Sequence, residues 1–139
     1  MRNATVAAAA ELGVSPLASA GYSITFWTEV GGAPPGLRGI LHVTTGGNAG
    51  FAQRSPVVWV GNAGELVVAV NTSASTSDQL NSSPMVVNQR LLVGLCFTPN
   101  SLTLRVRGVG GFALVESKTY AGTLQAFLPG AKLYVASEY

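Results

Sequence analysis

Apolar and polar residues alternate in steps of two along much of this chain, which is the pattern of β-strands that bury one face. The clearest example follows the turn Thr98-Pro99-Asn100: Leu102, Leu104 and Val106 alternate with Ser101, Thr103, Arg105 and Arg107. An uninterrupted apolar run, Leu91 to Phe97, precedes the turn. Together the two segments predict an antiparallel hairpin with one face exposed to solvent.

Further short segments have the β-branched and aromatic content of strands. They are Thr5–Leu12, Ser23–Val30, Leu37–Thr44, Pro56–Val60, Glu65–Val70, Met85–Val87, Phe112–Lys118 and Lys132–Ala136. The alanines of the first segment also suit a short helix, but we prefer a strand. Asn71–Ser83 is polar and long enough to be a functional or mobile loop. Nine or ten short strands without an amphipathic helix predict an all-β fold, a two-sheet antiparallel jelly-roll sandwich.

Composition changes the picture of the surface. The 139 residues suit a single domain over 1–139, and only 10% of them are charged, against about 25% in a typical soluble domain. A surface with so little charge resists association weakly, which favours a protein packed against others. A compositional bias of the host is the competing explanation. The net charge of +2 is scattered, with Arg105 and Arg107 the closest basic pair on a strand, so no nucleic acid partner is expected.

The sequence offers little catalytic chemistry. Its acidic residues each stand alone in their segments: Glu11, Glu29, Glu65, Asp78, Glu116 and Glu138. Retaining glycoside hydrolysis needs two carboxyl groups about 5 Å apart, and no such pair is visible. The single histidine, His42, and the single cysteine, Cys96, lie in different segments, so a nucleophile with its base is not expected either.

Three of these residues carry structural expectations instead. Cys96 stands in an apolar run, where a free cysteine behaves as a small buried hydrophobe. His42 is expected to be hydrogen-bonded or at the surface. Asp78, among the amides and hydroxyls of the polar loop, is the one place where a weak calcium site is conceivable, although calcium takes six to eight oxygen ligands. We expect no metal and no other cofactor, and leave a weak site near Asp78 open.

The order of strand motifs resembles a known family. The segments Tyr22–Trp27, Val57–Val70, Leu91–Val109 and Gly130–Val135 resemble, in order and spacing, the strands of laminin-G-like domains within the concanavalin A-like lectin jelly-roll superfamily. The resemblance implies the sandwich fold over nearly the whole chain. That superfamily includes enzymes, lectins and interaction modules, so the fold does not select a function.

Two functions remain after the chemistry is weighed. The first is a non-enzymatic structural or interaction module that decorates or stabilises a larger particle, such as a virus or phage capsid, with self-association as a further expectation. The second is a lectin-like carbohydrate-binding module used in attachment. The contact residues that we single out are Trp27, Trp59 and Tyr120, whose rings suit sugar stacking, and Arg105 and Arg107, which suit an acidic neighbour. Core packing is the competing interpretation for the aromatic residues, and solvation for the arginines.

The expected location follows from the same reasoning. The alanine-rich start and Ala18-Ser19-Ala20 loosely resemble a secretory signal, but Glu11 interrupts the apolar stretch. No run approaches the eighteen or so apolar residues of a membrane span. We therefore expect synthesis in the host cytoplasm and a final position on a virion or particle surface, with an extracellular location as the alternative.

Overall fold

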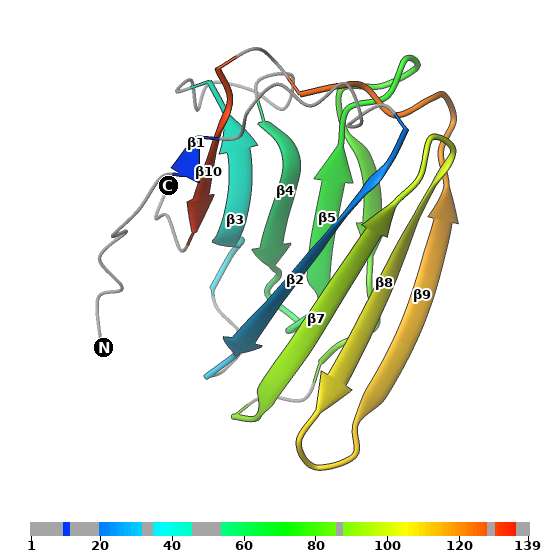
Figure 1. The fold of residues 1–139 in the computed structure, drawn as a ribbon. Helices are drawn as coiled ribbons and strands as arrows, with labels where there is room; N and C mark the ends of the chain where they lie inside the picture. Colours follow the sequence, from blue (N-terminus) through cyan, green and yellow to red (C-terminus); the bar gives the residue numbers. More distant parts are fainter. Residues whose placement is uncertain are drawn as a thin grey trace.

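In the part of the chain that the structure describes, ten β-strands form two antiparallel sheets that pack face to face (Figure 1). The computed structural model describes residues 10–11, 20–31, 35–45, 54–85, 88–127 and 130–135. The strands are β1 (Ala10–Glu11), β2 (Tyr22–Glu29), β3 (Arg38–Thr44), β4 (Arg54–Val60), β5 (Leu66–Val70), β6 (Asp78–Asn81), β7 (Arg90–Phe97), β8 (Ser101–Gly108), β9 (Ala113–Thr119) and β10 (Lys132–Val135). One sheet has the order β1-β10-β3-β4-β5-β6 and the other β2-β7-β8-β9. The predicted two-sheet antiparallel sandwich is confirmed.

The described residues contain no helix, and therefore no helix of the length and apolarity that crossing a membrane requires. Of the first predicted strand, only β1 lies within the described residues, where it pairs with β10. The rest of that segment lies outside them.

The core lies between the two sheets and is built by alternate residues. From β7 and β8 the inward side chains are Leu91, Val93, Leu95, Phe97, Leu102, Leu104 and Val106, all at most 1% exposed. They face the inward residues of β4 and β5, including Val58, Leu66, Val68 and Val70, in one continuous cluster. Burial of each such side chain stabilises the fold by about 1.5–3 kcal/mol, so this layer dominates the folding free energy.

The predicted hairpin of β7 and β8 is present with an unbroken register. Leu95 lies opposite Leu104, and every pair from Leu91 to Phe97 follows in step. Its turn is fastened by Thr98, whose Oγ1 accepts hydrogen bonds from the backbone N–H of Ser101 at 3.0 Å and of Asn100 at 3.3 Å. The register fixes which residues of both strands face outward.

The six-stranded sheet is also buried on part of its other face. Val57, Trp59, Val67 and Ala69 alternate with the core residues of β4 and β5, and they form a second cluster that is at most 6% exposed. His42, opposite Val57 in the register, is 2% exposed on the same side and stacks on Tyr134 at 5.1 Å. Burial on both faces explains why these two strands are continuously apolar. His42 is therefore not a surface residue.

Two predicted segments differ from the structure. The expected polar loop Asn71–Ser83 contains the short strand β6, which pairs with β5 and buries Leu80. This strand is held by its backbone pairing with β5 and by buried Leu80, while Lys118 from the other sheet neutralises the charge of Asp78. Met85 is buried but lies outside any strand, and the other two residues of the predicted segment Met85–Val87 lie outside the described residues.

Replacing Leu104 by alanine tests the register. Leu104 is fully buried, so Leu104→Ala should lower the free energy of unfolding by about 2–5 kcal/mol in chemical denaturation. Thr103→Ala, one residue away on the outer face, is the matched control and should cost less than about 1 kcal/mol. Equal losses in the two variants would show that the alternation is misassigned.

Candidate binding surface

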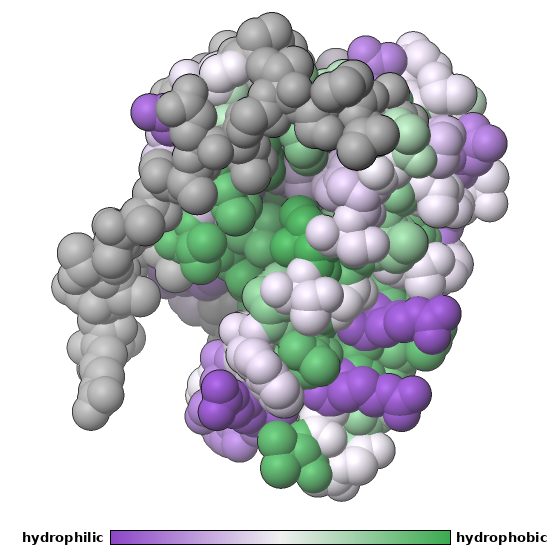
Figure 2. Space-filling model, in the orientation of Figure 1, coloured by the Kyte–Doolittle hydropathy of each residue, from purple (hydrophilic) through white to green (hydrophobic). Residues whose placement is uncertain are grey.

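The outer face of the four-stranded sheet places residues from four strands in rows. One row contains Trp27, Leu92 and Arg107, and the next contains Thr25, Gly94 and Arg105. Both arginines are exposed, as the alternation along β8 predicted. Figure 2 shows this face, where strongly hydrophilic groups stand beside apolar ones.

Trp27 belongs to this surface and not to the core. The alternation along β2 turns Ile24 and Phe26 inward and leaves Trp27 53% exposed. The sequence interpretation that favoured core packing for Trp27 is therefore corrected, because its apolar neighbours on the strand point the other way. The guanidinium carbon of Arg90 lies 4.9 Å from the Trp27 ring centroid, within cation–π range.

Arg90 is the surface residue that sequence reasoning missed. It is the first residue of β7, immediately before the apolar run, and is exposed. Extending the two-residue period of Leu91, Val93 and Leu95 back by one position would have placed Arg90 on the outer face. The run was interpreted as wholly apolar, which hid that period.

Three guanidinium groups thus lie on one face of the molecule. Within its described residues, Glu29 is the only carboxylate on this face, opposite Arg90 in the register, and no described carboxylate is within ion-pairing distance of Arg105 or Arg107. Arg105 and Arg107 are two residues apart on one strand, so their Cα atoms are about 7 Å apart. That spacing is shorter than the Debye length of about 10 Å at 0.1 M salt, so both charges act together on a bound anion.

Cys96 also lies on this face, contrary to the expectation that it is buried. It is exposed as a free thiol, in a row with Ser23, Thr103 and Ser117. The run Leu91–Phe97 is apolar throughout, yet only its odd-numbered residues face the core. Apolar composition alone therefore did not reveal the burial of each residue.

The remaining two aromatic candidates are buried and offer no ring face to a ligand. Trp59 is 4% exposed in the second cluster, and Tyr120 is 7% exposed in the core. Burial, followed by the charges of Asp78 and Cys96, raises the pKa of Tyr120. Burial and the neighbouring Tyr120 likewise raise the pKa of Tyr22 well above its ordinary value. Both phenols stay protonated and act as core aromatic residues.

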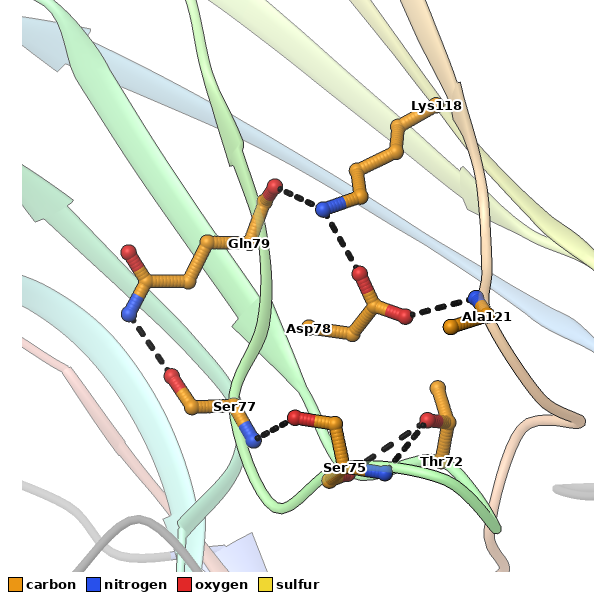
Figure 3. Close-up of polar contacts among 7 residues, drawn as sticks. All are labelled: Thr72, Ser75, Ser77, Asp78, Gln79, Lys118 and Ala121. Carbon is orange, nitrogen blue, oxygen red and sulfur yellow. Dashed lines mark hydrogen bonds and ion pairs between the residues drawn. The ribbon is translucent and has the colours of Figure 1, made fainter.

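The Asp78 carboxylate contacts Lys118 of β9 and Ala121, which follows β9 (Figure 3). Its Oδ1 accepts a 2.7 Å ion-pair contact from Lys118 Nζ, and its Oδ2 accepts a 3.0 Å hydrogen bond from the N–H of Ala121. Lys118 Nζ also donates to the carbonyl oxygen of Gln79 at 2.7 Å. Burial raises the pKa of Asp78, but the Lys118 and Ala121 hydrogen bonds and the Lys118 charge outweigh it, and the net pKa is lowered.

This network gives Asp78 a structural role. Each carboxylate oxygen accepts one contact, Oδ1 from Lys118 and Oδ2 from Ala121, and the Lys118 ammonium neutralises the carboxylate charge. In the part of the chain that the structure describes, no group of three or more histidine, cysteine or carboxylate side chains is placed to hold a metal. Asp78 is a structural residue that ties β6 to β9.

A cavity of about 240 Å³ lies at one end of the sandwich. Hydroxyl and amide side chains of Ser55, Asn71, Thr72 and Gln125 line it, together with the Phe127 ring. None of its described lining residues is titratable, so these residues supply no general acid or base. The outer face of the four-stranded sheet is the stronger candidate for a functional surface.

Comparisons with known proteins give a likeness of fold. No protein-family model matches the chain, and no curated protein matches it. Among solved structures, the chain is similar to the mouse laminin alpha1 chain, domains LG4-5, with 13% sequence identity and a TM-score of 0.46. The match covers 94% of this chain and 32% of that chain, so this chain spans about a third of its length.

Asp78→Asn should reduce stability in a pH-dependent way. A lowered pKa in the folded state gives stability that is present above the unfolded pKa of about 3.9 and is lost as pH falls through the lower folded value. At pH 7 we expect a loss of about 1–2 kcal/mol, limited because Lys118, 38% exposed, regains water. Denaturation at several pH values measures it.

The matched control for this variant is Glu29→Gln, which removes one negative charge from an exposed position. The free energy of unfolding of the Asp78→Asn protein should fall less between pH 5 and pH 2 than that of the wild-type protein, whereas Glu29→Gln breaks no ion pair and should cost less stability at pH 7 than Asp78→Asn. Identical acid dependence in all three proteins would contradict the assigned role of Asp78.

Proposed function

We propose that this chain is a non-enzymatic binding module that attaches to a larger protein assembly through the outer face of its four-stranded sheet. The observation that carries the proposal is that Arg90, Arg105 and Arg107 share one face with exposed Trp27, with Arg90 over its ring. Arginine forms bidentate hydrogen bonds with carboxylates and stacks on flat groups. An acidic protein surface therefore fits this face best.

The surface composition supports the same proposal. Charged residues are scarce in the chain, at 10%, and three of its eight basic residues stand on this one face. The remainder of the face consists largely of hydroxyl-bearing and small side chains, including Thr25, Thr103 and Ser117. Short side chains beside the arginines leave the guanidinium groups accessible to a large partner.

Carbohydrate binding is the second candidate, and Trp27 favours it. An exposed indole on a sheet with neighbouring hydroxyl groups can stack on a sugar ring and receive polar contacts at its edge. Arg90 lies over the ring at 4.9 Å and competes with a sugar for one ring face. For this reason we place an acidic protein partner first.

The identity of the assembly stays a prediction from the sequence. A virus or phage particle is the assembly expected there, and an extracellular location is the alternative. The basic outer face supports attachment to an acidic partner in either setting.

Neutralising the arginines should weaken binding to an acidic chain. A polyglutamate peptide of about ten residues spans about 33 Å, enough to cross the sheet, and its binding can be followed by amide chemical shifts. Arg105→Gln and Arg107→Gln should each raise the dissociation constant about three- to tenfold. Lys132→Gln, which removes the same charge from the six-stranded sheet, should have little effect. Equal effects of all three variants would contradict the proposed face.

Trp27→Ala tests the carbohydrate alternative on a broad array of neutral glycans. If sugars stack on this residue, signals on the array should fall about tenfold or more in the variant, because stacking is lost. Leu37→Ala, at a position of similar exposure, 55% against 53%, should retain them. An array without signals for the wild-type protein would eliminate this alternative and leave the acidic protein partner.

A further inference from the structure

The four edges of the two sheets are protected to different degrees. An unpaired strand edge invites pairing with another chain unless it is short, interrupted or carries inward-pointing charges. In the six-stranded sheet the edge strands are short, two residues in β1 and four in β6. In the four-stranded sheet, edge strand β9 turns Glu116 and Lys118 inward, where they bond to Ser83 and Asp78. Three of the four edges thus carry a protective feature.

Edge strand β2 carries none of these features. It is eight residues long and contains no proline. It pairs with β7 in an unbroken register, and its only charged residue, Glu29, stands at its end. No described strand pairs with its other side. The backbone groups along that side can accept a further strand.

An apolar groove lies beside this free edge. The six-stranded sheet continues past β3 to β10 and β1, beyond the point where β2 ends the other sheet (Figure 1). The groove has a volume of about 340 Å³, and its lining includes Trp27, Val30, Ile40, Val60 and Val135. Val135 is 49% exposed, and an apolar area is visible on this side of the molecule in Figure 2. A fifth strand beside β2 would cover it.

The groove also has a charge to be matched. Exposed Arg38 and exposed Glu29 both lie in its lining, and neither Glu29 nor any other described carboxylate is within ion-pairing distance of the Arg38 guanidinium. The rest of the lining is predominantly apolar. A segment that fits would therefore carry apolar side chains at alternate positions and an acidic residue at the end next to Arg38.

We propose that the free edge of β2 binds an extended segment of a partner protein by strand addition. The segment becomes a fifth strand of the β2-β7-β8-β9 sheet, and its alternate apolar side chains cover Ile40 and Val135. Backbone hydrogen bonds supply affinity in this mode, and the groove supplies selectivity. This site adjoins the outer face assigned above and shares Trp27 with it, but it makes a different type of contact, through the backbone of β2.

A second copy of the whole chain does not fit the same edge. If two β2 strands paired antiparallel in one continuous sheet, each copy would bring β10 and β1 of its six-stranded sheet into the space that the other copy's β10 and β1 occupy (Figure 1). A single extended segment has no second layer and avoids this clash. The partner therefore offers one strand and not a complete sandwich.

Titration with a synthetic peptide tests strand addition. The probe alternates threonine and valine over seven positions, has aspartate at both ends and is blocked at its termini. The peptide is added at about 1 mM, so that binding with a dissociation constant of about 1 mM or lower is detected. Amide hydrogen exchange of alternate β2 residues should then slow in the wild-type protein. A control peptide with proline at the central position should give less protection, because proline cannot donate to the ladder.

Two valine-to-lysine variants separate this site from other surfaces. Val135→Lys places a charge in the groove at an exposed position, so it should weaken peptide binding at least about tenfold without loss of the fold. Val115→Lys is the matched control on β9, 54% exposed, and should bind within about twofold of the wild type.

Three results would overturn the proposal. The first is that β2 amides gain no protection from exchange at the highest soluble peptide concentration. The second is that both lysine variants weaken peptide binding equally. The third is protection of β2 that rises with protein concentration without peptide, because it would show that a second copy occupies the edge.

Discussion

The burial of alternate leucine and valine side chains between two sheets is the constraint on which the rest of this structure depends. Leu95 and Leu104 lie opposite one another at the centre of that layer and are almost fully buried. Because side chains of a strand alternate between its faces, each inward residue fixes the outward direction of its neighbours. The exposed positions of Arg105 and Arg107 therefore follow from the packing of leucines and valines, and a slip by one residue would bury both charges.

The same constraint explains what could be predicted from the sequence. Along β8 the apolar and polar residues alternate, so the outward arginines were predicted correctly. Along β7 the outward positions after Arg90 are Leu92, Gly94 and Cys96. Because these residues are not polar, the sequence shows no alternation of apolar and polar residues there. The exposure of Cys96 could not be predicted there, because it depends on pairing with strands far away in the sequence. Trp27 was misplaced for a similar reason.

Contacts between the sheets were beyond the reach of sequence patterns. Asp78 and Lys118 are forty residues apart, and nothing local to either one indicates the other. Their contact neutralises the buried charge of Asp78 in β6 and joins this edge strand to Lys118 of edge strand β9 in the other sheet. The long unguarded edge of β2 likewise becomes apparent only when the strand order is known.

Solvent accessibility of the two tryptophan indoles is the most direct check on the proposed face. Trp27 and Trp59 are 53% and 4% exposed, and they lie on strands of different sheets. A soluble paramagnetic agent, observed by NMR, should broaden the indole N–H signal of Trp27 strongly, together with the guanidinium Nε–H signals of Arg90, Arg105 and Arg107, while the Trp59 signal stays sharp. Equal broadening of both indoles, or a sharp Trp27 signal, would contradict the assignment of the outer face.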